Sequence, residues 1–258
     1  MSDGSTELAG MLAAARAAEA DGAWERAAEC YERCLNEAPA PEHASLLLSL
    51  GRCHRSMAEA RAAWRFLMRA IVLYREAGDG AGMADATLEA LRIWAPPERQ
   101  RQLAMDALDL LGPGESRRHV YLLLHAQRFD EGRALAERRG YAEVLAEVAR
   151  EQARDAFNRG DHAPYLAAIE RLQEAFVAVG DHERAANTIR GAGYALLAAG
   201  RLADGEALAR RARDCAREHH LRFPEELAAL DVAGVAFARG DLDGCGAVLA
   251  SLSTNLDF

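Results

Sequence analysis

The sequence has few of the features that build strands, membrane spans or disulfide frameworks. Aromatic residues make up 6% of the 258 residues, there are seven prolines, and no Val/Ile/Thr alternation predicts a strand. No apolar stretch approaches the length of about eighteen residues that spans a bilayer, and the N-terminal segment lacks the basic and apolar regions of a signal peptide. The five cysteines are odd in number and irregularly spaced, which is typical of reduced thiols. These absences predict a soluble, cytoplasmic and all-helical protein.

Basic residues are outnumbered by acidic ones, 31 against 40, giving a formal net charge of −9. This balance argues against general affinity for nucleic acid, which requires a basic surface. The sequence also contains no GxxxxGK[ST] phosphate loop, GxSxG elbow, HExxH motif or glycine-rich dinucleotide turn after a strand. We therefore expect no cofactor and no enzymatic activity.

The most informative feature of the sequence is a pattern that occurs twice, forty residues apart. An apolar run with helical periodicity ends at Gly200, and a second helical run begins at once; the same pattern surrounds Gly240. Glycine readily takes the left-handed conformation that ends a helix, so each copy of the pattern predicts a helical hairpin. Hairpins that recur at a fixed spacing bury their apolar faces against one another.

The first hairpin, from about Thr6 to Ala38, carries a recognisable pattern. Small residues, a turn glycine, two aromatics and a closing proline follow one another at the offsets Ala15, Gly22, Trp24, Ala27, Tyr31, Cys34 and Pro39. This pattern resembles the tetratricopeptide repeat, with Cys34 in place of the usual alanine. The resemblance implies an all-α, right-handed superhelical solenoid of about seven antiparallel hairpins formed by residues 1–258.

The remaining hairpins match this pattern to different degrees. The second, Glu42 to Ala77, has Ala58 where the turn glycine belongs, and the third, Met83 to Leu111, turns at Pro96–Pro97. The fourth turns near Phe129 and the fifth at Gly160. The forty-residue pitch is longer than the usual repeat of about 34 residues and resembles the sensor regions of LuxR-class activators and other bacterial signalling proteins. Glycine-rich joints at 78–82 and 112–114 predict bends that separate residues 1–111 from 115–258.

In this family the first helix of each hairpin lines the concave surface, so the resemblance implies which side chains face a partner. The residues at these positions are Arg16, Arg52, Arg55, Arg117, Tyr121, Arg150, Arg154, Phe157, Asn187, Arg190 and Tyr194. Arginine forks pair with carboxylates and aromatics supply apolar anchors. We therefore expect a groove for an acidic segment of a protein or peptide partner. The alternative is that these arginines are solvated and paired with neighbouring acids.

A second group of residues allows two interpretations. Cys30, Cys34, Cys53 and His54 lie on helices expected to pack together, and such ligands could form a tetrahedral zinc site. However, no CxxC pair is present, and a buried free cysteine behaves as a small apolar residue. We expect core packing and no metal.

The sequence thus favours a non-enzymatic protein–protein interaction adaptor or scaffold. One alternative is a regulatory protein that senses a small ligand or a peptide. Another is an accessory enzyme of a bacterial pathway, which would need perturbed titratable residues in a closed cavity, such as His125 facing Arg117. The last helix also predicts self-association through the ends of the solenoid, by way of Leu242, Val248, Leu249 and Leu252.

Overall fold

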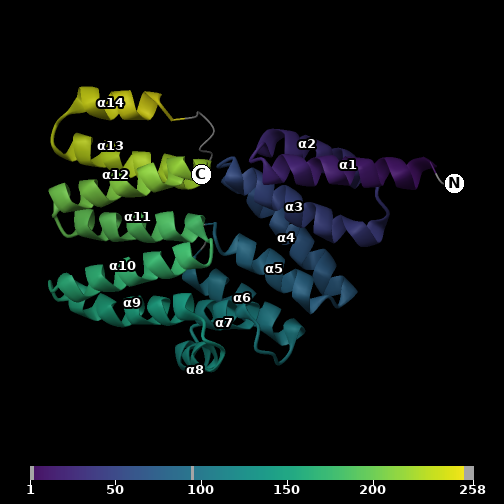
Figure 1. Ribbon diagram of the computed structural model, residues 1–258, viewed down its shortest axis with the longest axis horizontal. Coiled ribbons are helices and arrows are strands. Elements are labelled where there is room, and N and C mark those ends of the chain that lie inside the picture. The colour runs from purple at the N-terminus through teal and green to yellow at the C-terminus, as the bar shows by residue number, and fades with distance from the viewer. Residues whose placement is uncertain (1–2, 94–95, 253–258) are drawn as a thin grey trace. The chain divides into compact units, whose positions relative to one another are not determined.

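The chain folds into helical hairpins, as predicted. The computed structural model describes residues 3–93 and 96–252, with side chains except those of residues 3–6 and 155. These residues form fourteen α-helices and one short 3₁₀ helix, η1 (Ala40–Glu42). Consecutive helices form seven successive hairpins (Figure 1): α1 (Asp3–Ala20) with α2 (Trp24–Glu37), α3 (His43–Ser56) with α4 (Ala60–Ala77), α5 (Gly80–Ala90) with α6 (Pro97–Leu111), α7 (Arg117–His125) with α8 (Phe129–Arg139), α9 (Ala142–Asn158) with α10 (Ala163–Ala178), α11 (His182–Ala198) with α12 (Leu202–Glu218), and α13 (Arg222–Ala238) with α14 (Leu242–Ala250).

The hairpins belong to two compact units. Among the described residues, unit 1 ends at Leu135 and contains α1–α7 and the beginning of α8. Unit 2 begins at Ala136 and contains the end of α8 and α9–α14. The boundary lies after both glycine-rich joints, and bending at those joints stays a prediction.

Helix reversal in unit 2 occurs at strictly regular intervals. A residue with positive φ stands every twenty positions: Gly140, Gly160, Gly180, Gly200, His220 and Gly240. Each closes one helix in the left-handed conformation and lets the next begin two or three residues later. Residues forty positions apart therefore occupy equivalent places in successive hairpins.

Unit 1 achieves the same reversal with less regular spacing. Its positive-φ residues are Gly22, Ala58, Gly78, Gly112 and Gln127. Ala58, which replaces the expected turn glycine, itself takes the left-handed conformation with φ of 66°. The second hairpin therefore turns where the sequence predicts, despite its missing glycine.

The two glycine-rich joints have different local structures. Gly78 ends α4 in the left-handed conformation, and the Asp79 carboxylate accepts a hydrogen bond of 2.9 Å from the Gly82 amide, so α5 begins at once. At the second joint, the His119 ring lies 2.8 Å from the Gly112 carbonyl oxygen and packs against Gly114. The third hairpin differs slightly from its prediction: α6 begins at Pro97, whose missing N–H costs nothing in a first turn, and Trp94 lies outside the described residues.

Small residues allow the helices of a hairpin to approach closely. A Cβ atom added at Gly193 on α11 would lie 3.0 Å from the carbonyl oxygen of Gly205 on α12. In unit 1, the Leu67 side chain occupies the space where Gly51 has no side chain. Buried alanines line the same helix contacts, including Ala185, Ala192, Ala209 and Ala212. The abundance of alanine in the sequence thus reflects close helix packing.

Ion pairs connect the first helices of successive hairpins. In unit 1, Glu89 on α5 receives Arg52 Nε at 3.1 Å and Arg55 Nε at 3.2 Å, both from α3. One turn earlier on α5, Asp85 accepts a hydrogen bond of 2.8 Å from Arg118 Nη2 on α7. In unit 2, Arg190 Nη1 on α11 lies 3.2 Å from Asp231 Oδ2 on α13. Burial opposes ionisation of Glu89, but its neighbouring arginines prevail and lower its pKa.

No helix in the described part of the chain is both long and apolar enough to cross a bilayer.

The backbone of the turns can be tested by a matched pair of alanine substitutions. Gly200→Ala places a Cβ in open space but at a φ of 79°, so we expect the free energy of unfolding to fall by about 1–2 kcal/mol. Gly234→Ala, in open space inside α13, should raise it by about 0.5–1 kcal/mol. Denaturant unfolding of both variants measures the difference, and equal effects would contradict the assigned turn conformation.

The ion pairs between α3 and α5 predict a pH-dependent contribution to stability. Because the pKa of Glu89 is lower in the folded chain than in the unfolded chain, the carboxylate stabilises the fold fully above the ordinary glutamate pKa. This stabilisation is lost as the pH falls through the lowered pKa of the folded chain. Glu89→Gln should lower the free energy of unfolding by about 3 kcal/mol at pH 7 and flatten its acid dependence. Unfolding measured between neutral and acidic pH checks both, and an unchanged profile would refute this role.

Candidate functional site

A hollow of about 280 Å³ lies within unit 2, between the first helices of the fifth and sixth hairpins. Helices α9 and α11 form its walls and α10 forms its base. The lining residues are Glu147 and Arg150 from α9, Tyr165, Leu172 and Phe176 from α10, and Arg184, Asn187, Thr188 and Gly191 from α11. The hollow thus combines polar walls with a largely apolar base.

Helical periodicity explains why these residues meet. Positions 184, 187, 188 and 191 share one face of α11, because residues three, four and seven apart lie one above another on a helix. Glu147 and Arg150 lie one turn apart on α9 and line the same hollow as Leu172 and Phe176 of α10. Gly191 leaves room at the mouth, because no atom lies within 4 Å of a Cβ built there.

The charged side chains around the hollow form ion pairs with neighbouring side chains of opposite charge. Arg150 Nη2 contacts the carboxylates of both Glu151 and Glu147, the latter at 3.9 Å. The Arg184 Nε atom lies 3.1 Å from Asp181 Oδ2, and its guanidinium stands 5.5 Å from the centre of the Phe176 ring. These contacts position both arginines before any ligand arrives, which lowers the entropy lost on binding.

Glu147 supplies the one carboxylate among the residues that line the hollow. Burial against the surrounding protein raises its pKa, and this effect prevails over the opposing charges of Arg150 and Arg184. The site can therefore present an acceptor from Glu147, donors from the two arginines, and both functions from Asn187 and Thr188. This combination suits the main chain and one large side chain of a peptide.

Several residues predicted to line a groove lie at or near this hollow. Arg150 and Asn187 line it. The Arg154 side chain is 60% exposed and contacts Glu151 at 2.8 Å, and Tyr194, at the equivalent position forty residues later, is 61% exposed. Phe157 instead turns into its own hairpin, with its ring 4.5 Å from His162 and 4.9 Å from Tyr165.

Other predicted groove residues take part in contacts between helices. Arg52, Arg55 and Arg190 are engaged by the carboxylates of Glu89 and Asp231, as the alternative of paired arginines predicted. The remaining three lie in unit 1: Tyr121 is buried on α7, Arg117 is exposed at the start of that helix, and Arg16 is exposed on α1. The structure thus places the ten predicted residues of the groove, and Arg16, in both units rather than in one cluster.

Seven of the nine residues that line the hollow were not predicted from the sequence. The signal for Arg184, Thr188 and Gly191 was available, because each lies within one helical turn of Asn187. Glu147 stands one turn before Arg150 in the same way. The base residues from α10 could not be assigned from periodicity alone, because they resemble any other apolar core position.

The alternative of a zinc site finds no support in the arrangement of its candidate ligands. Cys34 and Cys53 are buried in the core of the first hairpins, and burial raises the pKa of the Cys53 thiol to about 12. His54 Nδ1 lies 2.5 Å from Glu59 Oε2, and its ring stacks on Phe66. Within the described residues, no three His, Cys, Asp or Glu side chains are grouped closely enough to hold a metal ion.

This architecture is similar to that of known tetratricopeptide-repeat proteins. Residues 11–45 match the model of the tetratricopeptide repeat, a segment that runs from α1 through α2 into α3. No curated protein matches the chain in sequence.

Two solved structures resemble the chain along most of its length. One is a signal transduction ATPase with numerous domains and a tetratricopeptide repeat sensor, from Pyrococcus horikoshii, with a TM-score of 0.50, 14% identity and 93% of this chain covered. The other is the Rap conjugation gene regulator of the plasmid pLS20 in complex with the Phr* peptide, with a TM-score of 0.50, 13% identity and 97% covered. This chain spans 40% of the first structure and 65% of the second.

At this level of sequence identity, the similarity of the structures shows a common fold and does not show a common function. Residues 11–45 therefore form a tetratricopeptide repeat, and the seven hairpins of the chain have the fold of the tetratricopeptide-repeat proteins.

Proposed function

We propose that the chain is a non-enzymatic adaptor that binds an extended segment of a cytoplasmic partner protein in the hollow of unit 2. The observation that carries this proposal is the lining of the hollow, with an apolar base under polar groups from two successive first helices. Tetratricopeptide repeats generally serve protein binding, which agrees with this function.

The dimensions of the hollow suit one large side chain of the partner. A volume of about 280 Å³ exceeds that of a single leucine or phenylalanine side chain, and the Tyr165, Leu172 and Phe176 side chains supply apolar contact. Asn187 and Thr188 stand above this base, where they can bond the main chain of the bound segment. The bound segment therefore combines an apolar anchor with main-chain hydrogen bonds.

One exposed arginine at the rim supports a preference for acidic residues in the bound segment. Arg154 is 60% exposed and lies one turn from Arg150 on α9, so both guanidiniums can reach carboxylates on either side of the anchor. Tyr194 adds an exposed aromatic surface on α11. Arg52, Arg55 and Arg190 are engaged by carboxylates of neighbouring helices, so in this proposal they act only through the placement of those helices.

A second candidate function is peptide sensing. The Rap regulator in the comparison was solved in complex with the Phr* peptide, and the hollow could accept a free peptide as well as a segment of a larger protein. A sensor would change its affinity for a second protein when the peptide binds. Titrating the second protein with and without peptide distinguishes this function from that of an adaptor.

The hollow can be tested directly by filling it. Peptides selected from a displayed random library should share acidic residues around one large apolar residue. Gly191→Leu places a side chain in the mouth without a clash, so we expect at least about tenfold weaker binding of these peptides, measured by calorimetry. Gly234→Leu, equally open on α13, is the control and should bind as the wild type does. Equal affinity of both variants would place the binding site elsewhere.

The contribution of charge is tested at the rim. Arg154→Glu should weaken binding of the same acidic peptides, and the effect should shrink as salt increases, because exposed charges are screened. Arg171→Glu changes the net charge equally on the exposed side of α10 and should leave affinity unchanged. Loss of affinity in both variants would indicate a general charge effect rather than a rim contact.

A further inference from the structure

The carboxylate of Glu147, at the wall of the hollow, lacks a close partner of opposite charge. Its ion pair with Arg150 is long, with 3.9 Å between Glu147 Oε1 and Arg150 Nη2, and the Arg150 guanidinium lies closer to Glu151. Among the described residues, no hydrogen bond reaches the Glu147 carboxylate. Burial therefore raises the pKa of Glu147, because these contacts do not replace the water that the carboxylate loses.

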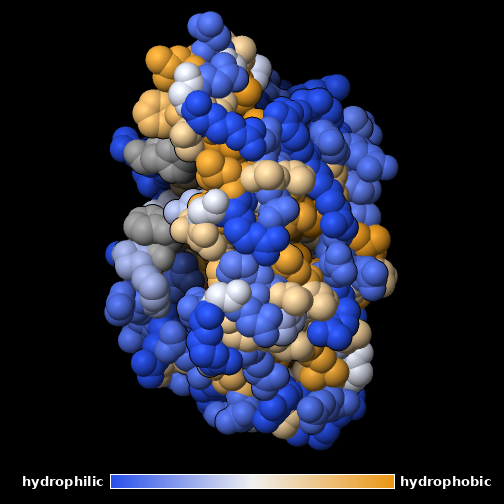
Figure 2. Space-filling model, turned by 90° about the vertical axis from the view of Figure 1, so that its left-hand side faces the viewer, coloured by the Kyte–Doolittle hydropathy of each residue, from blue (hydrophilic) through white to orange (hydrophobic). Residues whose placement is uncertain are grey.

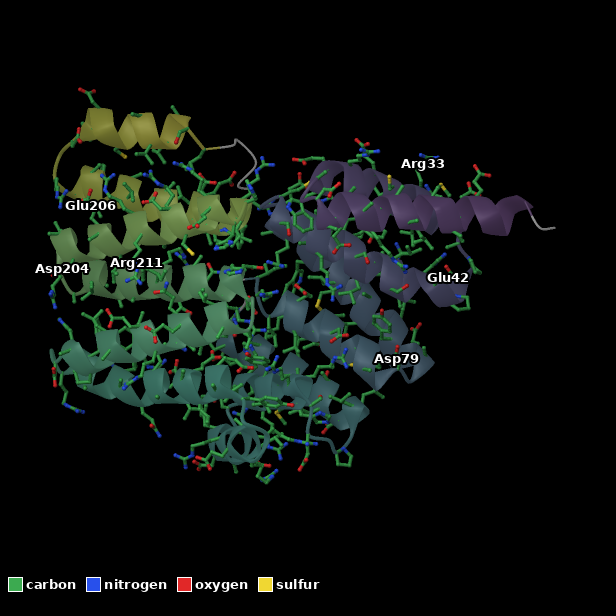
Figure 3. All side chains as sticks on the ribbon, viewed as in Figure 1. Arg33, Glu42, Asp79, Asp204, Glu206 and Arg211 are labelled. Carbon is green, nitrogen blue, oxygen red and sulfur yellow. The ribbon has the colours of Figure 1, made fainter. Side chains whose placement is uncertain are left out.

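A fully paired glutamate of the same unit shows the opposite behaviour. Glu206 on α12, labelled in Figure 3, accepts hydrogen bonds of 2.9 and 2.6 Å from Nε and Nη2 of Arg210 and also contacts Arg239. These bonds lower the pKa of Glu206. Figure 2 views the side of unit 2 on which Figure 3 places Glu206 and shows mainly hydrophilic side chains there. Glu147 thus differs from a surface glutamate that the fold itself pairs.

The charges around the hollow leave a surplus of one negative charge. Arg150 and Arg184, and the further carboxylates of Glu151 and Asp181, act on Glu147. Arg150 contacts Glu151, and Arg184 Nε lies 3.1 Å from Asp181 Oδ2. These two pairs balance one another, so the charge of Glu147 remains, and one positive charge from a ligand would neutralise it.

We infer that the hollow holds an ammonium group of the bound segment against Glu147, beside an apolar part of the same residue. This inference rests on the proposed function and names the chemistry of the residue that the hollow accepts. An ammonium group donates three hydrogen bonds, and Glu147, Asn187 and Thr188 all carry oxygen acceptors at the lining. The space of about 280 Å³ leaves room for this group beside one apolar side chain.

Two sources can supply the ammonium group. At a free N-terminus it lies beside the side chain of the first residue, which can rest on the apolar base of the hollow. In a lysine, the apolar stem takes that place and the ammonium group lies at its end. Arg154, 60% exposed at the rim, is not part of the lining. Carboxylates further along the bound segment are therefore compatible with either source.

Phenylalanine amide tests the ammonium group without a peptide. It carries an ammonium group and one large apolar side chain but no carboxylate, and its N-acetyl derivative lacks the charge. In NMR titrations of the wild type, phenylalanine amide should shift the amide signals of Asn187, Thr188 and Gly191. The N-acetyl derivative should bind at least about tenfold more weakly, because it loses a hydrogen bond between charged groups.

Glu147→Gln keeps the shape of the side chain and should bind both compounds equally weakly. Glu170→Gln, which removes the same charge on the exposed side of α10, is the control and should prefer phenylalanine amide as the wild type does. The inference is wrong if the wild type binds neither compound or both equally, or if Glu147→Gln keeps the preference for the charged one.

Peptides selected from the displayed library identify the source. Each is synthesised with a free N-terminus, with an acetylated N-terminus, and with norleucine in place of lysine, and calorimetry measures its affinity. A loss of at least about tenfold on acetylation assigns the site to the N-terminal amine, and a loss with norleucine assigns it to lysine. Either loss should disappear in Glu147→Gln.

The same measurements separate this inference from the proposed function. If neither change weakens binding while Gly191→Leu does, the ammonium group is not recognised and the hollow remains the peptide site. If Gly191→Leu leaves peptide affinity unchanged but phenylalanine amide still requires Glu147, the ammonium site stands and the peptide site lies elsewhere.

Discussion

Helix reversal at a left-handed residue is the constraint on which the arrangement of unit 2 depends. One such residue every twenty positions gives α9–α13 nearly the same length, 16 or 17 residues, so equivalent side chains recur forty residues apart. Glu147 and Asn187, or Arg154 and Tyr194, are pairs of this kind. Because α9 and α11 thus present the same face in the same phase, their side chains converge on one hollow.

Arginine has two roles in this acidic chain. Arg52, Arg55 and Arg190 join the first helices of neighbouring hairpins through carboxylates that are largely removed from water. Arg154 remains 60% exposed, and Arg150 reaches the hollow while its neighbours hold it. The groove is therefore less positive than a count of its arginines suggests, and those near the hollow have less conformational freedom to lose on binding.

The hollow arises where packing between neighbouring hairpins is incomplete. Between α9 and α11 the side chains leave a space with an apolar base formed by α10. The proposed binding site thus lies where the side chains of successive similar hairpins do not fill the space between them.

The sequence by itself determined the hairpins, because turn residues and helical periodicity are local properties. It predicted the turns at Gly160, Gly200 and Gly240, and even the turn at Ala58, whose conformation the flanking helices impose. Asn187 and Arg150 were also predicted as binding residues from repeat position alone. Only the tertiary structure decided that Arg190 pairs with Asp231, that Phe157 turns inward, and that Glu147, Arg184 and three α10 side chains complete the hollow. These outcomes depend on which side chains from neighbouring helices compete for the same space and charge, and the periodicity of a single helix carries no information about its neighbours.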